Sequence, residues 1–174
     1  ASRWHSMLLH EVLRKRLAGF QLRGNAPGAK DRPATRAEKI GHATRGHPRF
    51  RALCEDPRLI RMLEALIGPN PIWYGDMALC KPPRIGTDKP WHQDSAYFPY
   101  EPFGHGVGVW IALDDAAVAN GCMQVLRGGH KLGPKRHVHL TDCTIEPGRV
   151  DVGGAEPIEM EAGGILLFSP LLPH

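Results

Sequence analysis

Three residues have the types and the spacing of a metal site. His92 and Asp94 lie two positions apart in Trp91-His92-Gln93-Asp94, and His174 ends the segment Ser169-Pro170-Leu171-Leu172-Pro173-His174. A His-x-Asp pair on one strand places an imidazole nitrogen and a carboxylate oxygen on the same side of an ion. A second histidine from a distant strand completes a facial set of three, which is typical of non-haem Fe(II) oxygenases, where an organic co-substrate and oxygen take the open positions.

The pair by itself is a weak signal. The chain has ten His and nine Asp in 174 residues, so random placement gives a His-x-Asp match in roughly half of such chains. In the alternative interpretation, His92 and Asp94 lie in a solvated loop and His174 lies at a frayed end. A zinc site is a further alternative, because two His and one Asp also suit catalytic Zn²⁺ with a water in the fourth position.

The composition indicates one ordinary domain with enough apolar material for a core, since 42% of the 174 residues are hydrophobic. The 20 Gly and 16 Pro separate short apolar runs, which favours β structure with many turns. No apolar run approaches the roughly 18 residues that a membrane span needs, and the N-terminal residues lack a signal-peptide pattern. The four cysteines have no paired spacing, which predicts thiols in a reducing cytoplasm.

Charge is distributed unevenly along the chain. Residues 1–61 carry 14 Lys and Arg against 5 acidic residues, whereas residues 62–174 carry 8 against 13. A basic front section could attract nucleic acid, an anionic membrane or a phosphorylated substrate. Its arginines are spread over several predicted helices with almost no aromatic residues between them, so we expect a solvated face and no nucleic-acid or membrane partner.

The first 70 residues are predicted to form a helical support region. Helical spacing of apolar residues covers 6–18, and a loop that we expect to be flexible follows at 24–37. The clearest helix is 57–67, with Asp56 as N-cap, Pro57 in the first turn and Gly68 at the end. Its apolar positions predict a broad buried face made of Leu59, Ile60, Met62, Leu63, Leu66 and Ile67.

After residue 71 the pattern changes to short strands. We expect strands at 72–81, 91–94, 106–113 and 122–126, a loop over most of 133–156, and a hairpin formed by 158–161 and 165–168. In the strand 106–113, Trp110 shares a face with Gly108 and Ala112, which leaves room beside it for a planar ligand.

Helices followed by strands, without alternation of the two, predict one domain over 1–174. It consists of the support region and a core over 71–174, which we expect to be truncated at its C-terminal end. The fold class is mainly β with N-terminal helices, and the core is expected to be an antiparallel sandwich or a jelly roll. A jelly roll encloses a cavity at one mouth, where position 174 could meet positions 92 and 94.

An ordered series of motifs resembles the phytanoyl-CoA dioxygenase (PhyH) family, from about residue 38 to 174. The motifs are Lys39-Ile-Gly-His42, Gly68-Pro69-Asn70, Met77-Ala-Leu-Cys-Lys81-Pro82-Pro83, His92-Gln-Asp-Ser-Ala-Tyr97-Phe98-Pro99-Tyr100, Trp110-Ile-Ala and Asn120-Gly121-Cys122. The resemblance implies a double-stranded β-helix (jelly-roll, cupin-like) core. It also implies an Fe(II)- and 2-oxoglutarate-dependent dioxygenase that hydroxylates an unactivated C–H of a small organic or acyl-type substrate, with oxygen consumed and succinate and CO₂ released.

By the same resemblance, His92, Asp94 and His174 match the catalytic metal ligands. The family residues that contact the 2-oxoacid or line its pocket correspond to Lys39, Met77, Gln93 and Trp110. Each of these four has a structural alternative, as a solvated lysine, as core residues or as a strand-surface amide.

The resemblance further implies a Ser and an Arg beyond position 174 that clamp the far carboxylate of 2-oxoglutarate. We therefore expect impaired co-substrate binding by this stretch of chain. The competing functions are a catalytically inactive cupin-like metal-binding module and the zinc site. The sequence predicts neither the substrate nor the oligomeric state.

Overall fold

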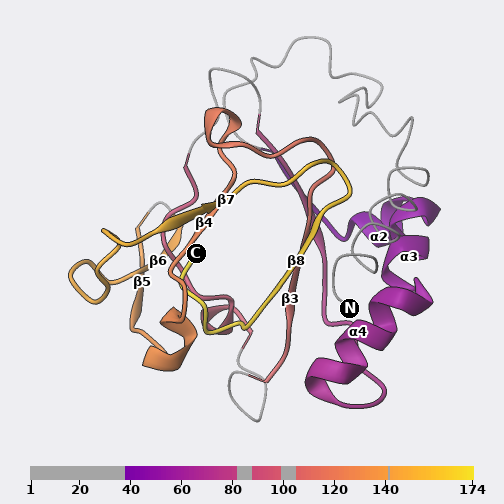
Figure 1. The fold of residues 1–174 in the computed structure, drawn as a ribbon, viewed down its shortest axis with the longest axis horizontal. Helices are drawn as coiled ribbons and strands as arrows, with labels where there is room; N and C mark the ends of the chain where they lie inside the picture. Colours follow the sequence, from indigo (N-terminus) through magenta and orange to yellow (C-terminus); the bar gives the residue numbers. More distant parts are fainter. Residues whose placement is uncertain (1–37, 82–87, 99–104, 141) are drawn as a thin grey trace.

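The computed structural model describes residues 38–81, 88–98, 105–140 and 142–174. In these ranges short strands dominate and the helices gather at one side, as expected from the sequence (Figure 1). The helices are α2 (Ala43–Gly46), α3 (Pro48–Cys54) and α4 (Pro57–Ile67), and the single 3₁₀ turns are η1 (Asp94–Ala96), η2 (Val118–Asn120) and η3 (Gly129–Leu132). The strands are β1 (Glu38–Gly41), β2 (Met77–Cys80), β3 (Gly108–Ile111), β4 (Met123–Val125), β5 (His137–His139), β6 (Cys143–Ile145), β7 (Glu156–Ile158) and β8 (Ile165–Phe168).

Local signals explain where α4 begins and ends. The Asp56 carboxylate accepts a hydrogen bond from the backbone N–H of Arg58 at 2.9 Å, and Pro57 occupies the first turn, where its missing N–H costs nothing. The helix stops at Gly68, whose φ of 93° favours glycine. The predicted bounds are confirmed. The predicted buried face is only partly right, because Leu59 is buried but Leu66 and Ile67 are 60% and 42% exposed.

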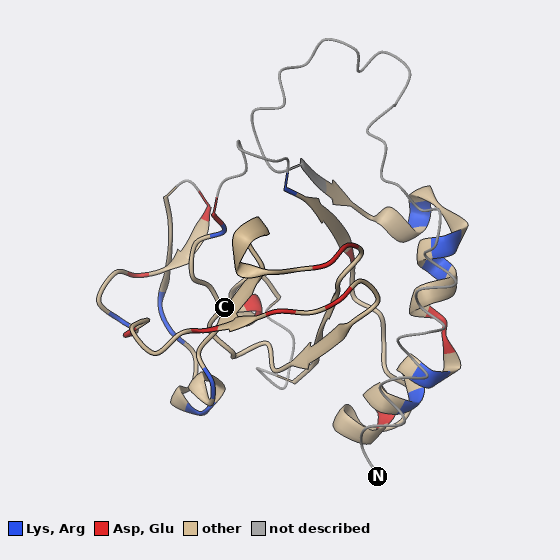
Figure 2. Cartoon of the chain, turned by 45° about the horizontal axis from the view of Figure 1, so that its top comes forward, with Lys and Arg blue, Asp and Glu red and all other residues tan. Residues whose placement is uncertain are grey.

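Basic residues lie along the three helices, as Figure 2 shows in blue. Arg45, Arg49, Arg51 and Arg61 are all exposed. None of the helices in the described ranges is long and apolar enough to cross a membrane. The predicted helix at 6–18 and loop at 24–37 lie outside the described residues.

Within the described ranges the strands form four antiparallel pairs, β1 with β2, β3 with β8, β4 with β7 and β5 with β6. Single backbone hydrogen bonds connect two of these pairs through segments that are not regular strands. The N–H of Ile145 in β6 donates to the carbonyl of Trp91 at 2.7 Å, and the N–H of Leu126, just after β4, donates to the carbonyl of Pro173 at 3.1 Å. Segments far apart in sequence thereby lie side by side around residues 91–94 and 170–174.

The predicted strand 165–168 is confirmed by β8, and the predicted strands 106–113 and 122–126 are confirmed in part by β3 and β4, but other predictions for this region are wrong. The expected loop over 133–156 contains β5 and β6, and the expected hairpin does not form, because β7 pairs with β4 and β8 pairs with β3. β2 covers only the last part of the predicted strand 72–81. Residues 91–93 are irregular and Asp94 opens η1. In each case long-range hydrogen bonding, which local pattern does not encode, decided the structure.

Candidate metal centre

The three residues singled out by sequence lie together. The Oδ1 atom of Asp94 is 3.6 Å from Nε2 of His92 and 3.8 Å from Nε2 of His174. The two imidazole rings have centroids 4.2 Å apart, and one donor atom of each residue lies within 4.8 Å of the other two. An ion with bonds of roughly 2.0–2.2 Å fits between donors at this spacing. Across the described residues, this is the group of His, Cys, Asp and Glu that could hold a metal.

The backbone brings His174 to His92. The N–H of His92 donates to the carbonyl of His174 at 2.9 Å, and the N–H of His174 donates back to the carbonyl of His92 at 3.0 Å. This reciprocal pair is the local geometry of an antiparallel sheet, and it places two residues 82 positions apart directly opposite each other. The positions of both histidines are therefore set by the main chain.

Each imidazole is also oriented by a carbonyl two residues earlier in the chain. Nδ1 of His92 lies 3.0 Å from the oxygen of Pro90, and Nδ1 of His174 lies 3.0 Å from the oxygen of Leu172. A carbonyl only accepts, so each Nδ1 carries the proton and each Nε2 presents its lone pair toward Asp94. This is the arrangement by which proteins fix the tautomer of a metal-binding histidine.

The electrostatics of the centre suit a cation. Burial, and then the proximity of His174 and Lys89, lower the pKa of His92 from 6.5 to about 3, so this imidazole is neutral and able to ligate at pH 7. Burial raises the pKa of the Asp94 carboxyl, while His174 and Lys89 act in the opposite direction. A half-buried carboxylate beside the neutral His92 imidazole is unfavourable unless a positive charge compensates it, so the centre suits a bound cation.

Asp94 lies at the first position of the η1 turn. The carbonyl of Asp94 accepts hydrogen bonds from the N–H groups of Tyr97 at 2.9 Å and Phe98 at 3.2 Å. The chain between the two residues is extended, since Gln93 has φ −122° and ψ 132°, so the side chains of His92 and Asp94 leave the backbone on the same face. Oδ1 of Asp94 thereby lies 3.6 Å from Nε2 of His92.

Gln93, expected to contact a 2-oxoacid, is fully buried and bonded to the protein's own backbone. Its Nε2 donates to the carbonyls of Gly133 at 3.1 Å and Leu171 at 2.6 Å, and its Oε1 accepts from the N–H of Lys135 at 2.7 Å. Both amide N–H groups are thus used. The side chain ties the segment between the two ligands to the segment that leads to His174, and this is a structural role.

The other expected cofactor contacts are distributed along the sheets. Lys39 lies in β1 opposite Leu79, and its side chain is outside the described part of the structure. Met77 is in β2 and 56% exposed. Trp110 is half-buried in β3 opposite Leu166. The room expected beside Gly108 is filled, because a Cβ there would lie 2.4–2.7 Å from the ring of Phe168.

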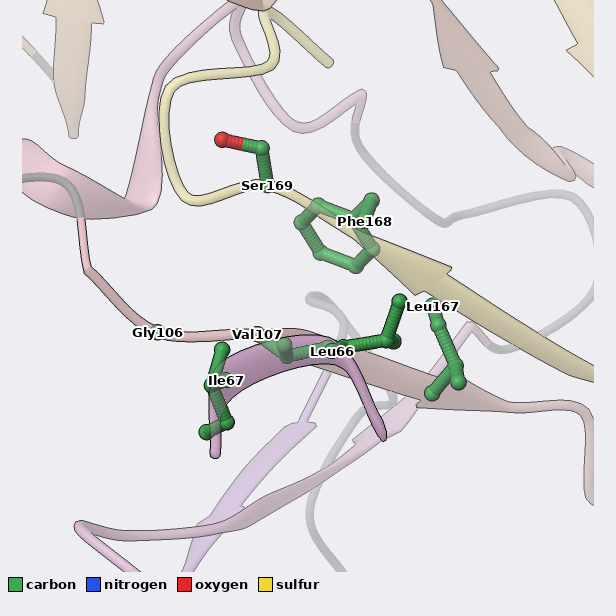
Figure 3. A pocket seen from close by; sticks show the side chains of 7 residues that line it. All are labelled: Leu66, Ile67, Gly106, Val107, Leu167, Phe168 and Ser169. Carbon is green, nitrogen blue, oxygen red and sulfur yellow. The ribbon is translucent and has the colours of Figure 1, made fainter. Parts of the chain in front are cut away.

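Phe168 lies directly behind His174. Their rings meet edge to face with centroids 4.8 Å apart, and Gly108 permits this position because it has no side chain. On its other side Phe168 borders an apolar cavity of about 230 Å³ between the end of α4 and strands β3 and β8 (Figure 3). The cavity is lined by Leu66, Ile67, Gly106, Val107, Leu167, Phe168 and Ser169.

Sequence reasoning missed two residues that support the centre, Phe168 and His137. Nε2 of His137 accepts from the backbone N–H of Gln93 at 3.0 Å, while its Nδ1 lies 2.8 Å from the carbonyl of Lys135. His137 falls in the stretch predicted as loop, and the fit of Phe168 against Gly108 depends on the β3–β8 register. Neither supporting role could be recognised from the sequence without knowing which strands pair.

Comparisons with known proteins agree with this geometry. The family model of phytanoyl-CoA dioxygenase (PhyH) matches residues 9–174. A phytanoyl-CoA dioxygenase domain-containing protein 1 of Mus musculus is 29% identical over 151 residues, covering 82% of this chain and 52% of that protein. The peroxisomal phytanoyl-CoA dioxygenase of Homo sapiens is 31% identical over 137 residues, covering 70% of this chain and 39% of the enzyme.

A solved structure is similar over most of the chain. The crystal structure of EvdO2 from Micromonospora carbonacea var. aurantiaca, complexed with 2-oxoglutarate, superposes with a TM-score of 0.69 at 26% identity, covering 94% of this chain and 72% of EvdO2. The chain spans about half or less of the length of the relatives named above. Together the family match and the convergence of its motif residues show that this chain belongs to the phytanoyl-CoA dioxygenase (PhyH) family.

Proposed function

We propose that the protein is a non-haem Fe(II)- and 2-oxoglutarate-dependent oxygenase whose metal ligands are His92, Asp94 and His174. The observation that carries this proposal is the meeting of two Nε2 atoms and one carboxylate oxygen within 4.8 Å of one another. Two imidazoles and one carboxylate on one side of an ion are the donor set of non-haem Fe(II) oxygenases. Family membership and the 2-oxoglutarate complex of EvdO2 point to Fe(II) and 2-oxoglutarate as the cofactors.

The chain's own residues would orient and shield these cofactors. Bound Fe(II) with 2-oxoglutarate supplies the redox chemistry with oxygen. His92 and His174 present Nε2 because their Nδ1 protons are committed to backbone carbonyls. Burial of both imidazoles keeps water from the protein side of the ion. Lys39, Met77 and Trp110 are proposed to line the side where the 2-oxoacid binds, with the Lys39 ammonium offsetting part of its double negative charge.

The reaction we propose is hydroxylation of an unactivated C–H bond in a small organic or acyl-type substrate, with release of succinate and CO₂. Asp94 supports hydroxylation in particular, because its carboxylate occupies a coordination position that a halide would otherwise need. The core that carries the site is proposed to be a double-stranded β-helix. Support comes from the lateral hydrogen bonds that join β6, residues 91–92, residues 173–174 and β4.

Anaerobic binding tests this function without knowledge of the substrate. Titration of the full protein with Fe(II) and then 2-oxoglutarate should produce the visible charge-transfer absorption of a chelated 2-oxoacid. The replacements Asp94→Ala and His174→Ala should abolish it, whereas His139→Ala, at an exposed histidine in β5, should leave it unchanged. Succinate formation under oxygen should likewise be lost in Asp94→Ala and His174→Ala and retained in His139→Ala. An equal absorption band in His174→Ala would contradict the proposed ligand set.

A zinc site is the second candidate, because the same donors suit catalytic Zn²⁺ with a water in the fourth position. The two functions predict different responses to 2-oxoglutarate. A zinc enzyme should bind its metal equally well with and without the 2-oxoacid, while the proposed oxygenase should gain Fe(II) affinity from it. A catalytically inactive binding module would bind both cofactors and release no succinate across a broad panel of substrates.

A further inference from the structure

Tyr97 contacts the segments of two of the three proposed ligands. Its ring stands edge-on to the imidazole of His92, with centroids 5.8 Å apart and an interplanar angle of 87°. Its backbone N–H donates to the carbonyl of Asp94 at 2.9 Å, at the end of η1. The His92 ring also meets the His174 ring, with centroids 4.2 Å apart. The imidazole therefore contacts two aromatic rings, and its Nδ1 lies 3.0 Å from the carbonyl oxygen of Pro90.

The phenol of Tyr97 is tied into a charged cluster that consists of Lys89, Tyr97 and Asp142. The hydroxyl donates to Oδ1 of Asp142 at 3.0 Å, and Nζ of Lys89 donates to the hydroxyl oxygen at 3.0 Å. Lys89 and Asp142 also form an ion pair at 2.5 Å. The side chains of this pair are only 29% and 26% exposed, so solvent screens the cluster incompletely.

This cluster joins three pieces of chain around the metal centre. Lys89 precedes His92 by three residues, Tyr97 follows Asp94 by three, and Asp142 stands next to β6. The carboxylate of Asp142 accepts the N–H of Cys143 at 2.8 Å, which fixes it to that strand. β6 in turn bonds Trp91 through Ile145. The phenol therefore closes a ring of contacts that begins and ends beside His92.

We propose that Tyr97 is a positioning residue for the metal centre, which holds the His92 imidazole and the Asp94 turn in the geometry that receives an ion. The inference rests on the proposed metal site, and it assigns to Tyr97 no contact with the ion. The edge-on contact of the Tyr97 ring restricts rotation of the His92 imidazole. The hydroxyl, anchored by Lys89 and Asp142, keeps the ring from swinging into solvent. Residues that orient ligands in this way typically contribute about 10- to 100-fold to metal affinity.

Titration of the apo-protein with Co²⁺ tests the proposal, because the d–d absorption of Co²⁺ reports both affinity and ligand geometry. Tyr97→Ala should weaken Co²⁺ binding by about tenfold or more and change the band intensities. Tyr97→Phe keeps the ring and should recover most of the affinity, with a residual loss of a few-fold from the missing hydroxyl. Asp142→Asn should resemble Tyr97→Phe.

The matched control is Tyr74→Ala. Tyr74 is 67% exposed and stands edge-on to Phe98, the neighbour of Tyr97, at 5.1 Å. This control should leave Co²⁺ affinity and spectrum unchanged, which separates positioning of His92 from general loosening of nearby aromatic residues. Far-UV circular dichroism and thermal melting verify that each variant is folded.

Three results would overturn the proposal. A folded Tyr97→Ala protein with wild-type affinity and spectrum would show that the ring does not position His92. If that variant does not fold, Tyr97→Leu replaces the ring with an aliphatic group of lesser bulk, and wild-type Co²⁺ binding by it would count equally against the proposal. Failure of the wild-type protein to bind Co²⁺ or Fe(II) would remove the proposed function, and the positioning role with it.

Discussion

Two regions of this molecule differ sharply in how completely they are packed. Around the metal centre, His92 is 6% exposed, Gln93 is fully buried, and Pro170 and Pro173 are fully buried as well. In the β1–β2 pair, by contrast, Ile40, Met77 and Leu79 are 41–56% exposed. The same chain thus encloses its polar centre tightly and leaves apolar side chains of a two-stranded sheet open to solvent.

The difference has a physical basis in hydrogen bonding. Segments around the centre bond to one another through backbone groups and through the buried amide of Gln93. The β1–β2 pair is hydrogen-bonded along its shared edge. The hydrogen bonds that position the proposed ligands therefore come from within this chain, and they do not depend on what covers β1 and β2.

The largest expected effect is at Gln93. Gln93→Leu removes three hydrogen bonds and leaves two carbonyls and one N–H without partners in a buried place, which should lower the free energy of unfolding by about 4 kcal/mol. Urea denaturation measures the loss. The matched change Gln124→Leu, at an exposed position of β4, should cost less than about 0.5 kcal/mol. If both changes lower the free energy of unfolding by the same amount, the region around Gln93 is not more tightly packed than an exposed strand position.

Metal should strengthen the tight region selectively. Co²⁺ at about 100 times its Kd should raise the free energy of unfolding by about 2.7 kcal/mol, and chelation should reverse the gain. Hydrogen exchange should show added protection at the amides of His92 and His174, which bond each other, and much less in β1 and β2. His174→Ala should show no Co²⁺ effect. Protection spread uniformly over the chain would mean that the two regions respond as one unit.

A smaller effect is expected where a glycine allows close packing. Gly108→Ala places a methyl group 2.4–2.7 Å from three ring atoms of Phe168, so the ring must move away from its position against His174. We expect a loss of about 1–3 kcal/mol and weaker Co²⁺ binding. Gly75→Ala is the control, because a Cβ there meets nothing within 4 Å. Thermal melting compares the two, and an unaffected Gly108→Ala protein would contradict the proposed fit.

The smallest effect should be in the open region. Leu79→Asn, at a side chain 47% exposed, should change the free energy of unfolding by less than about 0.5 kcal/mol. The adjacent residue in the same strand provides the contrast, since Ala78 is only 5% exposed and Ala78→Asn should cost about 2 kcal/mol. A loss above about 1 kcal/mol in Leu79→Asn would show that this face is packed in solution.

Some features of the fold and of the candidate site could be predicted from the sequence, because the signals for them are local. Asp56, Pro57 and Gly68 determine the ends of α4 without reference to the rest of the chain. The spacing of His92 and Asp94 and the family motifs pointed to the three side chains that the structure brings together. Helical periodicity found the apolar face of α4, but it does not say what covers that face, and Leu66 proved exposed.

Features that depend on distant partners could not be predicted. Gln93 received a cofactor role because the three backbone groups that occupy its amide lie 40 to 78 residues away. β5 and β6 lie in a stretch with no alternation, and they form strands because they pair with each other. The turn at Asp94 likewise follows from contacts of η1 with Pro170, whose carbonyl accepts the N–H of Ser95 at 3.0 Å.

The reciprocal bonds between His92 and His174 have a consequence for how the protein is made. A nascent chain that has emerged only as far as β7 carries His92 and Asp94 but lacks the third donor, so it holds an ion weakly. Capture of the metal must therefore wait until the segment after β8 has been synthesised and has docked. Stable loading with iron would then follow the docking of that segment, and it would act as a check that the two distant parts of the sequence have met.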